Sequence, residues 1–250
     1  MEMQDAESKS SSTDRSGLVV AALLLVTILL ALGLRLYRLD NQSLWYDEGF
    51  SVYLASMDID EITSRTAADI QPPLYYYLLH GWIQLFGDTE WALRALSVLF
   101  GVFTVPLIYA VAQTLFRSRL AGLLAALLVA VSPLHVWYGQ EVRMYTLLTF
   151  LCLLSSYFLL LAIRAKRDWA LPLLWTAYTA ANVAALYTHY FAFFVLAFQA
   201  VYVLAVLAVQ RFRPLHLLLG SLASAIATVL LYLPWLPHLF TRYGTDTSYW

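Results

Sequence analysis

The run LVVAALLLVTILLALGL, residues 18–34, decides the fold class of this chain. It carries no charge, and Arg15 and Arg35 bound it. An apolar stretch of about 17–25 residues is long enough to cross a bilayer as a helix. A secretory signal would have a shorter apolar core, followed by small residues at a cleavage site, and this run has neither. We therefore predict a retained membrane helix.

The composition of the whole chain leads to the same class. Of its 250 residues, 61% are hydrophobic and 12% are charged, whereas soluble domains carry about 25% charged residues. The chain is therefore predicted to be an integral membrane protein with membrane lipids around it. Its formal net charge of −1 supplies no basic field, which excludes nucleic acid as a partner.

Further apolar runs follow the first one, with short connections between them. Together they predict a domain of about seven spans over residues 17–240: 18–34, 91–116, 120–137, 144–163, 169–187, 191–209 and 215–233. Residues 1–16 are polar and rich in serine, and we expect a disordered cytoplasmic tail there. Residues 241–250 are expected to begin an outer segment that is truncated.

Positive charge gathers in alternate turns and predicts the orientation. The basic turns contain Arg117, Arg119, Arg164, Lys166, Arg167, Arg211 and Arg213. Cytoplasmic loops carry an excess of Lys and Arg, so the N-terminus is expected in the cytoplasm and the long loop 37–90 outside it. Within this loop, Leu74–Phe86 is too short for a span, and its aromatic residues predict a helix lying at the membrane interface.

Two adjacent carboxylates, Asp47 and Glu48, lie in this outer loop between Trp45 and Phe50. One of them can act as a general base while its neighbour binds or orients a hydroxyl group or a metal. The alternative is an acidic first turn of a helix, which the helix dipole favours. The flanking aromatic rings suit stacking against a sugar and suit an interfacial belt equally well.

Arg94 stands about one turn into the second predicted span, four residues after Glu90. This spacing allows a helix ion pair worth roughly 0.2–0.5 kcal/mol. The other interpretation is a functional residue, because ionisable groups at that depth are costly.

Residues 132–145 are expected to form a short outer loop. Pro133 loosens the end of its helix and Gly139 permits a tight turn. The loop offers four polar side chains together, namely His135, Gln140, Glu141 and Arg143. An arginine here can bind a phosphate through two hydrogen bonds, whereas the alternative is a polar cap in which Arg143 extends toward the surface.

The sequence contains neither a Walker loop nor a GxGxxG motif after a strand. An enzyme acting outside the cytoplasm lacks nucleotide sugars and needs an activated donor that is delivered on a lipid. The histidines and acids are too scattered for a metal motif such as HExxH. The metal is therefore unknown and no cofactor is certain, with a divalent cation left as an open alternative.

Four segments resemble, in the same order, the GT-C glycosyltransferases, and especially the family 39-like group of protein O-mannosyltransferases and lipid A-modifying transferases. They are residues 44–50, 71–78, 90–97 and 138–145. The resemblance covers residues 18–235 and implies an all-α, polytopic transmembrane helical bundle with interfacial helices in the first extracytoplasmic loop. It further implies an inverting hexosyl or pentosyl transferase. The donor would be a polyprenyl-phosphate sugar, and the acceptor a glycolipid, glycan or protein.

The resemblance also implies roles for individual residues. Asp47 resembles the base that deprotonates the acceptor, and Glu48 assists it. Arg143, with Glu141 nearby and Arg94 sharing the role, resembles the residues that hold the donor phosphate. The implied substrate-binding set is completed by His135, Gln71 and Tyr75. Gln71 stands where the lipid A-modifying members have a lysine, which argues against that substrate.

Two other functions remain open. A lipid or sugar transporter of similar topology would place ionisable groups near the middle of its spans, whereas here they crowd the outer ends. A non-catalytic scaffold subunit is the second alternative, because members of the group are much longer than this chain.

Overall fold

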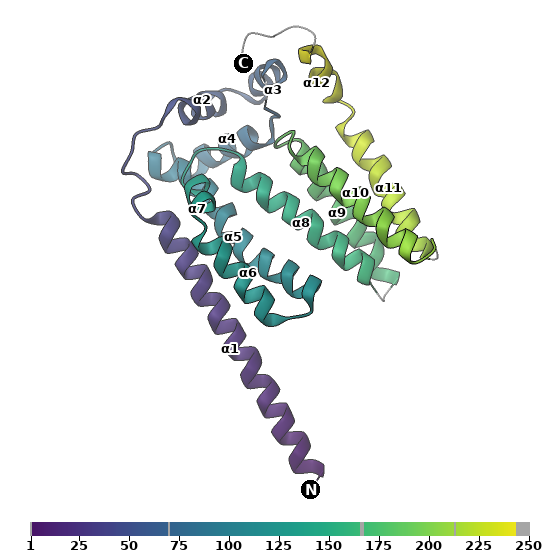
Figure 1. Cartoon of the computed structure of the whole chain (residues 1–250). Coiled ribbons are helices and arrows are strands. Elements are labelled where there is room, and N and C mark those ends of the chain that lie inside the picture. The colour runs from purple at the N-terminus through teal and green to yellow at the C-terminus, as the bar shows by residue number, and fades with distance from the viewer. Residues whose placement is uncertain (1, 70, 166–167, 213, 244–250) are drawn as a thin grey trace.

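The computed structural model describes residues 2–69, 71–165, 168–212 and 214–243, and all its regular elements there are helices (Figure 1). Short helices gather at one end of a bundle of long ones. In chain order the helices are α1 (Glu2–Leu36), α2 (Tyr46–Ala55), α3 (Ile59–Ala68), α4 (Leu74–Phe86), α5 (Glu90–Phe116), α6 (Arg119–Val131), α7 (Pro133–Gly139), α8 (Tyr145–Arg164), a 3-10 turn (Asp168–Ala170), α9 (Leu171–Leu186), α10 (Ala192–Val209), α11 (Leu215–Tyr232) and α12 (Leu236–Tyr243).

Five of these helices are long and apolar enough to cross a membrane: Ser16–Leu36 within α1, then α5, α8, α10 and α11. A sixth span is present if α6 and α7, which meet at a bend of 59°, are counted together. The remaining predicted span, α9, is apolar but has only 16 residues. Such a helix is about 24 Å long, less than the roughly 30 Å of a bilayer core, so the prediction of seven full spans is only partly met.

The bend between α6 and α7 follows from Pro133. Proline has no backbone N–H and suits the first position of a helix, and Pro133 occupies that position in α7. The preceding Ser132 caps the new helix by accepting a hydrogen bond from the backbone N–H of His135 at 3.5 Å. The predicted loosening of this helix end is therefore a break that redirects the chain.

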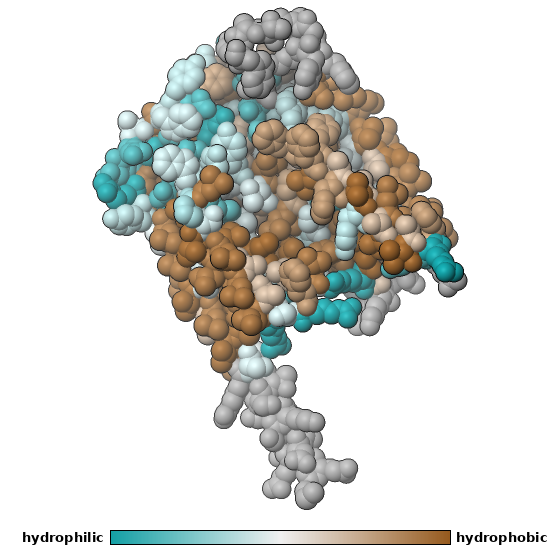
Figure 2. Space-filling view, viewed as in Figure 1, coloured by the Kyte–Doolittle hydropathy of each residue, from teal (hydrophilic) through white to brown (hydrophobic). Residues whose placement is uncertain are grey.

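The surface agrees with an integral membrane protein. Figure 2 shows apolar side chains over the flanks of the bundle and polar ones at its two ends. The basic turns after α5, α8 and α10 lie at the end opposite to α2, α3 and α4 (Figure 1). Of the predicted basic residues, Lys166, Arg167 and Arg213 lie outside the described residues.

The two ends of the chain differ from expectation or lie outside the description. Residues 2–16, expected to be a disordered tail, form the first turns of α1. Extending an existing helix adds one hydrogen bond per residue without a new nucleation cost. Of the expected outer segment 241–250, residues up to Tyr243 belong to α12, and residues 244–250 lie outside the described residues.

The helix predicted for Leu74–Phe86 is confirmed as α4, with the same bounds, and Gly87 ends it at a positive φ of 82°. Its buried residues Tyr75, Tyr76 and Leu79 belong to a core that also includes residues of α2, α5 and α8. This core holds the outer helices on the bundle and fixes the position of α2.

Candidate active site

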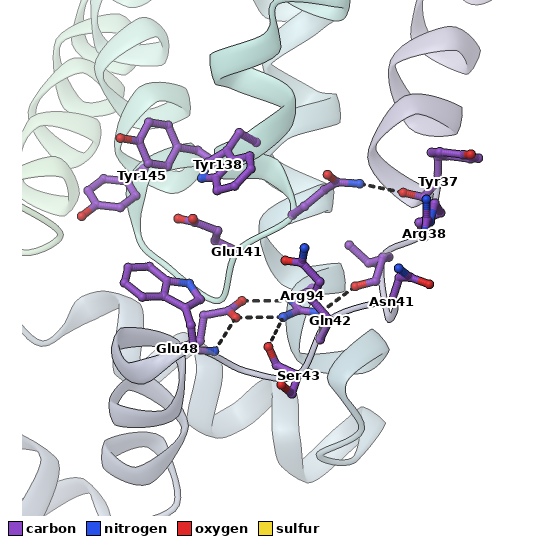
Figure 3. Close-up of a pocket in the computed structure, with 14 residues that line it drawn as sticks. Tyr37, Arg38, Asn41, Gln42, Ser43, Glu48, Arg94, Tyr138, Glu141 and Tyr145 are labelled. Atoms are coloured by element: carbon purple, nitrogen blue, oxygen red, sulfur yellow. Dashed lines mark hydrogen bonds and ion pairs between the residues drawn. The ribbon is translucent and has the colours of Figure 1, made fainter.

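Glu48 is a buried anchor at the start of α2, with only 1% of its surface exposed. Its Oε1 accepts hydrogen bonds from Nε of Arg94 at 3.0 Å and from the backbone N–H of Val142 at 2.8 Å. Its Oε2 accepts from Nη2 of Arg94 at 2.8 Å and from the backbone N–H of Trp45 at 3.3 Å. Figure 3 shows this bidentate pair. One carboxylate therefore ties together α2, α5 and the segment before α8.

Arg94 uses all its donors inside the protein. Besides Glu48, it donates from Nη1 to the carbonyl oxygens of Leu39 and Gln42, each at 2.8 Å, and from Nη2 to that of Ser43 at 3.5 Å. A guanidinium has five N–H donors, and each of them has an acceptor here. We therefore reassign Arg94 from the expected phosphate binding to holding the α1–α2 linker. Its ion pair is with Glu48, not with Glu90.

Asp47 is the accessible member of the acidic pair. Its side chain is 39% exposed, and its Oδ2 lies 3.7 Å from Nη2 of Arg143. Nη1 of Arg143 donates at 3.4 Å both to the carbonyl oxygen of Asp47 and to Oγ of Ser51. The guanidinium also lies over the ring of Tyr145, 5.7 Å from its centroid. Asp47 and Glu48 thus occupy the acidic first turn of α2, as the alternative interpretation expects, and face different partners.

Two buried donors beside this pair have no hydrogen-bond partner among the described residues: Nε of Arg143 and the hydroxyl of Tyr76. Burial raises the pKa of the Tyr76 phenol, and the positive charge of Arg143 opposes that shift. Tyr76 lies in the segment 71–78 but was not predicted as a site residue, because three consecutive tyrosines do not show which of them lies near Arg143.

His189 also approaches this region. Its ring centroid lies 6.2 Å from that of Tyr145, and its Nδ1 accepts a hydrogen bond from the backbone N–H of Phe191 at 3.0 Å. Burial and the charge of Arg143 lower the pKa of His189, which favours a neutral imidazole.

The four polar side chains expected together in residues 132–145 point to different places. His135 contacts Nη2 of Arg35 at 2.8 Å through Nδ1. Gln140 donates from Nε2 to the carbonyl oxygens of Arg35 at 3.1 Å and Tyr37 at 2.9 Å. These two side chains therefore bind the end of α1, although Gln140 also lines the cavity described below.

Two other expected substrate-binding residues, Tyr75 and Gln71, lie in or at the edge of the protein interior. Tyr75 is fully buried, and its hydroxyl lies 3.5 Å from Oγ of Ser97. Burial raises the pKa of its phenol. Gln71 is half-buried, and its Oε1 is buried without a hydrogen-bond partner. We reassign Tyr75 to the core, whereas a binding role for Gln71 stays a prediction.

Arg35 explains the neighbouring glycines. It is completely buried, and it donates from Nη1 to the carbonyl oxygens of Ala31 at 2.9 Å and Ala130 at 3.2 Å. A Cβ atom at Gly139 or Gly101 would lie 3.2 Å or 3.1 Å from its side chain. Gly139 was expected to permit a tight turn, but in the structure it makes room for a buried arginine.

A cavity of about 800 Å³ opens between the α1–α2 linker and residues 137–145. Glu48 and Arg94 line it, and so does Glu141, which is 8% exposed (Figure 3). Burial raises the pKa of the Glu141 carboxyl group. Among the described residues, no group of three His, Cys, Asp or Glu side chains could hold a metal ion.

Comparison with known proteins identifies the family. The model of the dolichyl-phosphate-mannose-protein mannosyltransferase family matches residues 70–236, more than half of the chain. The chain belongs to this family. Because the match begins at residue 70, it includes the segment with Arg143 but not the Asp47–Glu48 pair.

Two individual proteins are similar to this family member. An uncharacterized protein of Aquifex aeolicus (strain VF5) is 25% identical over 169 residues, which are 68% of this chain and 33% of that protein. The crystal structure of ArnT from Cupriavidus metallidurans in the apo state matches with a TM-score of 0.62 and 18% identity, over 96% of this chain and 45% of that one. The chain thus spans about a third and just under half of their lengths. The predicted GT-C-like, all-helical membrane fold is confirmed.

Proposed function

We propose that this chain carries the active site of a membrane glycosyltransferase. The enzyme transfers a hexosyl or pentosyl group from a polyprenyl-phosphate-linked donor to a lipid, glycan or protein acceptor. The observation that carries the proposal is the juxtaposition of the half-exposed carboxylate of Asp47 and the buried guanidinium of Arg143, 3.7 Å apart.

The chemistry needs both groups. As the bond between sugar and phosphate breaks, negative charge develops on the leaving oxygens, and a fixed cation stabilises it. The acceptor hydroxyl must lose its proton to a base at the same time. Asp47 is the base in this scheme, because Glu48 is held by Arg94. Displacement by one acceptor hydroxyl inverts the anomeric carbon.

The buried donors near Asp47 support a phosphate at this place. Within the part of the chain that the structure describes, Nε of Arg143 and the hydroxyl of Tyr76 both lack an acceptor. A buried polar group without a partner costs about 1–3 kcal/mol, and an anionic oxygen would satisfy both groups. Arg143 presents a flat fork of donors of the kind that binds phosphate through two hydrogen bonds.

The proposed sidedness rests on charge. The candidate site lies at the end of the bundle opposite to the basic turns that contain Arg117, Arg119 and Arg211. Since cytoplasmic loops are enriched in Lys and Arg, we place the N-terminus in the cytoplasm and the site on the extracytoplasmic side. A polyprenyl-phosphate sugar is available there, unlike a nucleotide sugar.

The test is a transfer assay on the full-length protein in detergent with a radiolabelled polyprenyl-phosphate mannose. Loss of donor cleavage in Asp47→Asn, with cleavage retained in Glu61→Gln, supports the enzyme. Glu61 is the matched control because it is an exposed acid of α3 that pairs with Arg65. Uptake of the sugar lipid into vesicles without cleavage would support a transporter, and no turnover in any form would support a scaffold subunit. A parallel assay with a chelator tests the divalent cation.

A further inference from the structure

The cavity and the Asp47–Arg143 pair are connected through Glu48. Its carboxylate pairs with Arg94 and also accepts a hydrogen bond from the backbone N–H of Val142, the residue before Arg143. Glu48 and Arg94 line the cavity, whereas Asp47 and Arg143 are not among its lining residues in the part of the chain that the structure describes. The cavity is therefore lined by different side chains from those of the proposed reacting pair.

The walls of the cavity combine aromatic rings with side-chain amides. The lining residues of these two kinds are Tyr37, Trp45, Trp137, Tyr138, Tyr145, Asn41, Gln42 and Gln140. The rings of Tyr138 and Tyr145 lie with their centroids 4.6 Å apart. Aromatic rings offer flat apolar faces, and amides donate and accept hydrogen bonds at fixed positions. A sugar ring, with apolar C–H faces and hydroxyl groups at its edge, matches both.

The charge inside the cavity disfavours a phosphate. The charges of Glu48 and Arg94 neutralise one another, and all five N–H groups of Arg94 have acceptors within the protein. Glu141 has no cation within ion-pair distance among the described residues, and Figure 3 shows its carboxyl group between Tyr138 and the Glu48–Arg94 pair. An anion beside Glu141 would be repelled by this acid, and the remaining lining cation, Arg38, is exposed, so water screens its charge. An uncharged hydroxyl group can donate a hydrogen bond to the ionised carboxylate of Glu141 and can accept one from its protonated carboxyl group.

From this arrangement we infer that the cavity binds the uncharged saccharide ring of a substrate, with the buried carboxyl group of Glu141 as a hydrogen-bonding partner. The inference rests on the proposed function, because the saccharide belongs to either the donor or the acceptor of that reaction. Glu141 and Arg143, which the resemblance places together at the donor phosphate, thereby take separate roles. Arg143 faces Asp47 and the phosphate, whereas Glu141 faces the sugar.

The volume and surroundings of the cavity fit this ligand. About 800 Å³ falls within the range of roughly 300–1,000 Å³ that is usual for small-molecule sites. Arg38 is exposed and belongs to the lining on the side of α1 (Figure 3). An acidic group attached to the sugar can therefore remain at the mouth while the ring enters.

Binding is tested without turnover, on the full-length protein in phosphatidylcholine nanodiscs. The probes are butyl α-D-mannopyranoside, butyl β-D-glucopyranoside and butyl phosphate. Their binding is measured by saturation-transfer-difference NMR.

We expect at least one glycoside to bind through its ring protons. Glu141→Ala and Tyr138→Ala should each weaken binding at least tenfold. Gln42→Ala, which changes an exposed lining side chain, should weaken binding with an unchanged melting temperature. The matched control Tyr53→Ala removes an exposed tyrosine of α2 outside the cavity and should bind like the unmodified protein.

Several results would overturn the inference: butyl phosphate that binds more tightly than both glycosides, or unchanged binding in folded Glu141→Ala and Tyr138→Ala proteins. Asp47→Asn should lose transfer while it keeps glycoside binding within twofold. Glycoside binding that depends on Glu141, in a protein without transfer activity, would reject the transferase proposal and retain the saccharide site.

In Asp47→Asn protein, displacement of the butyl glycoside by polyprenyl-phosphate mannose assigns the site to the donor, and displacement by a glycolipid assigns it to the acceptor. Displacement by neither would contradict the inference.

Discussion

Arg143 lies 3.7 Å from Asp47, although 96 residues separate the two in the chain. Their neighbours are paired in the same register, since the backbone N–H of Val142 donates to Glu48 at 2.8 Å. Two consecutive residues of α2 therefore face two consecutive residues of the segment before α8. The buried contact of Glu48 holds the register, and the contact between Asp47 and Arg143 is the more accessible of the two.

Asp47→Asn should abolish transfer and leave the fold intact. A general base contributes roughly 10²–10⁴-fold to a rate, so we expect a loss of that size in the transfer assay. Since Asp47 is half-exposed and its contact with Arg143 is long, the loss of stability should stay below about 1 kcal/mol. Thermal unfolding in detergent measures this. An equal loss of transfer in the control Glu61→Gln would contradict the assignment.

Arg94→Met should destabilise the protein strongly. Removing one partner of a buried ion pair costs about 3–5 kcal/mol, and here the carbonyl oxygens of Leu39 and Gln42 lose their donor as well. The matched control is Arg65→Met, which breaks the exposed pair with Glu61 and should cost about 0–1 kcal/mol.

The coupling within the buried pair can be measured with a double-mutant cycle. Arg94→Met and Glu48→Gln together should cost clearly less than the sum of the two single substitutions, because residues in one network are not additive. Additive losses in chemical unfolding would show that the two side chains act independently.

Gly101→Ala should destabilise the bundle, although alanine is the better helix former. The new Cβ would lie 3.1 Å from Nε of Arg35, and four hydrogen-bonding contacts hold that buried side chain in place. Overpacking of this kind costs about 1–3 kcal/mol. Gly81→Ala in α4 is the control, because nothing lies within 4 Å of its new Cβ. It should be neutral or stabilise by about 0.5–1 kcal/mol, and a stabilising Gly101→Ala would contradict the close packing.

The stability of Glu141→Gln should depend on pH in a direction that the burial of Glu141 determines. Burial raises the pKa of this carboxyl group above its ordinary value of 4.5, and the nearby charge of Glu48 acts in the same sense, while Arg143 opposes it. The folded protein therefore binds the proton more tightly than the unfolded chain does. Above the raised pKa the ionised group destabilises the folded state, and this cost disappears as the pH falls toward 4.5.

Glu141→Gln should accordingly melt at a higher temperature than the unmodified protein at pH 8, and the difference should shrink on acidification. Melting curves of both proteins between pH 5 and pH 8 test the sign. A difference that grows as the pH falls would show that Glu141 is stabilised as a carboxylate.

Much of the architecture could be predicted because it depends on hydrophobicity along the chain. The bounds of α4 and the break at Pro133 follow from local residue types, and α9 was placed correctly as a helix. The apolar pattern of residues 169–187 predicted a full span, but α9 has only 16 residues. The juxtaposition of Asp47 and Arg143 was expected from the resemblance and from the side of the membrane that both residues share.

The directions of the side chains could not be predicted in this way. Arg94 has Glu90 one turn away, yet it pairs with Glu48, which is 46 residues distant. The sequence predicts Arg35 as the polar boundary of a span, but its buried guanidinium donates to two carbonyl oxygens at the end of α6. Glu141 and Arg143 are two positions apart, and only the fold of the backbone between them turns one to the cavity and the other to Asp47. These pairings depend on the tertiary structure.

The anchoring of Glu48 has a consequence for the order of the two acidic letters. Successive side chains on a helix point about 100° apart. Fixing Glu48, the third residue of α2, therefore also fixes the direction in which Asp47, the second residue, points. Exchanging the dipeptide to Glu-Asp would preserve charge, composition and helix propensity. An aspartate at position 48 would be too short to reach Arg94. A glutamate at position 47 would be longer and more flexible, so its carboxylate would have no fixed orientation. The direction of the Asp47 carboxylate therefore depends on the buried pairing of its neighbour Glu48.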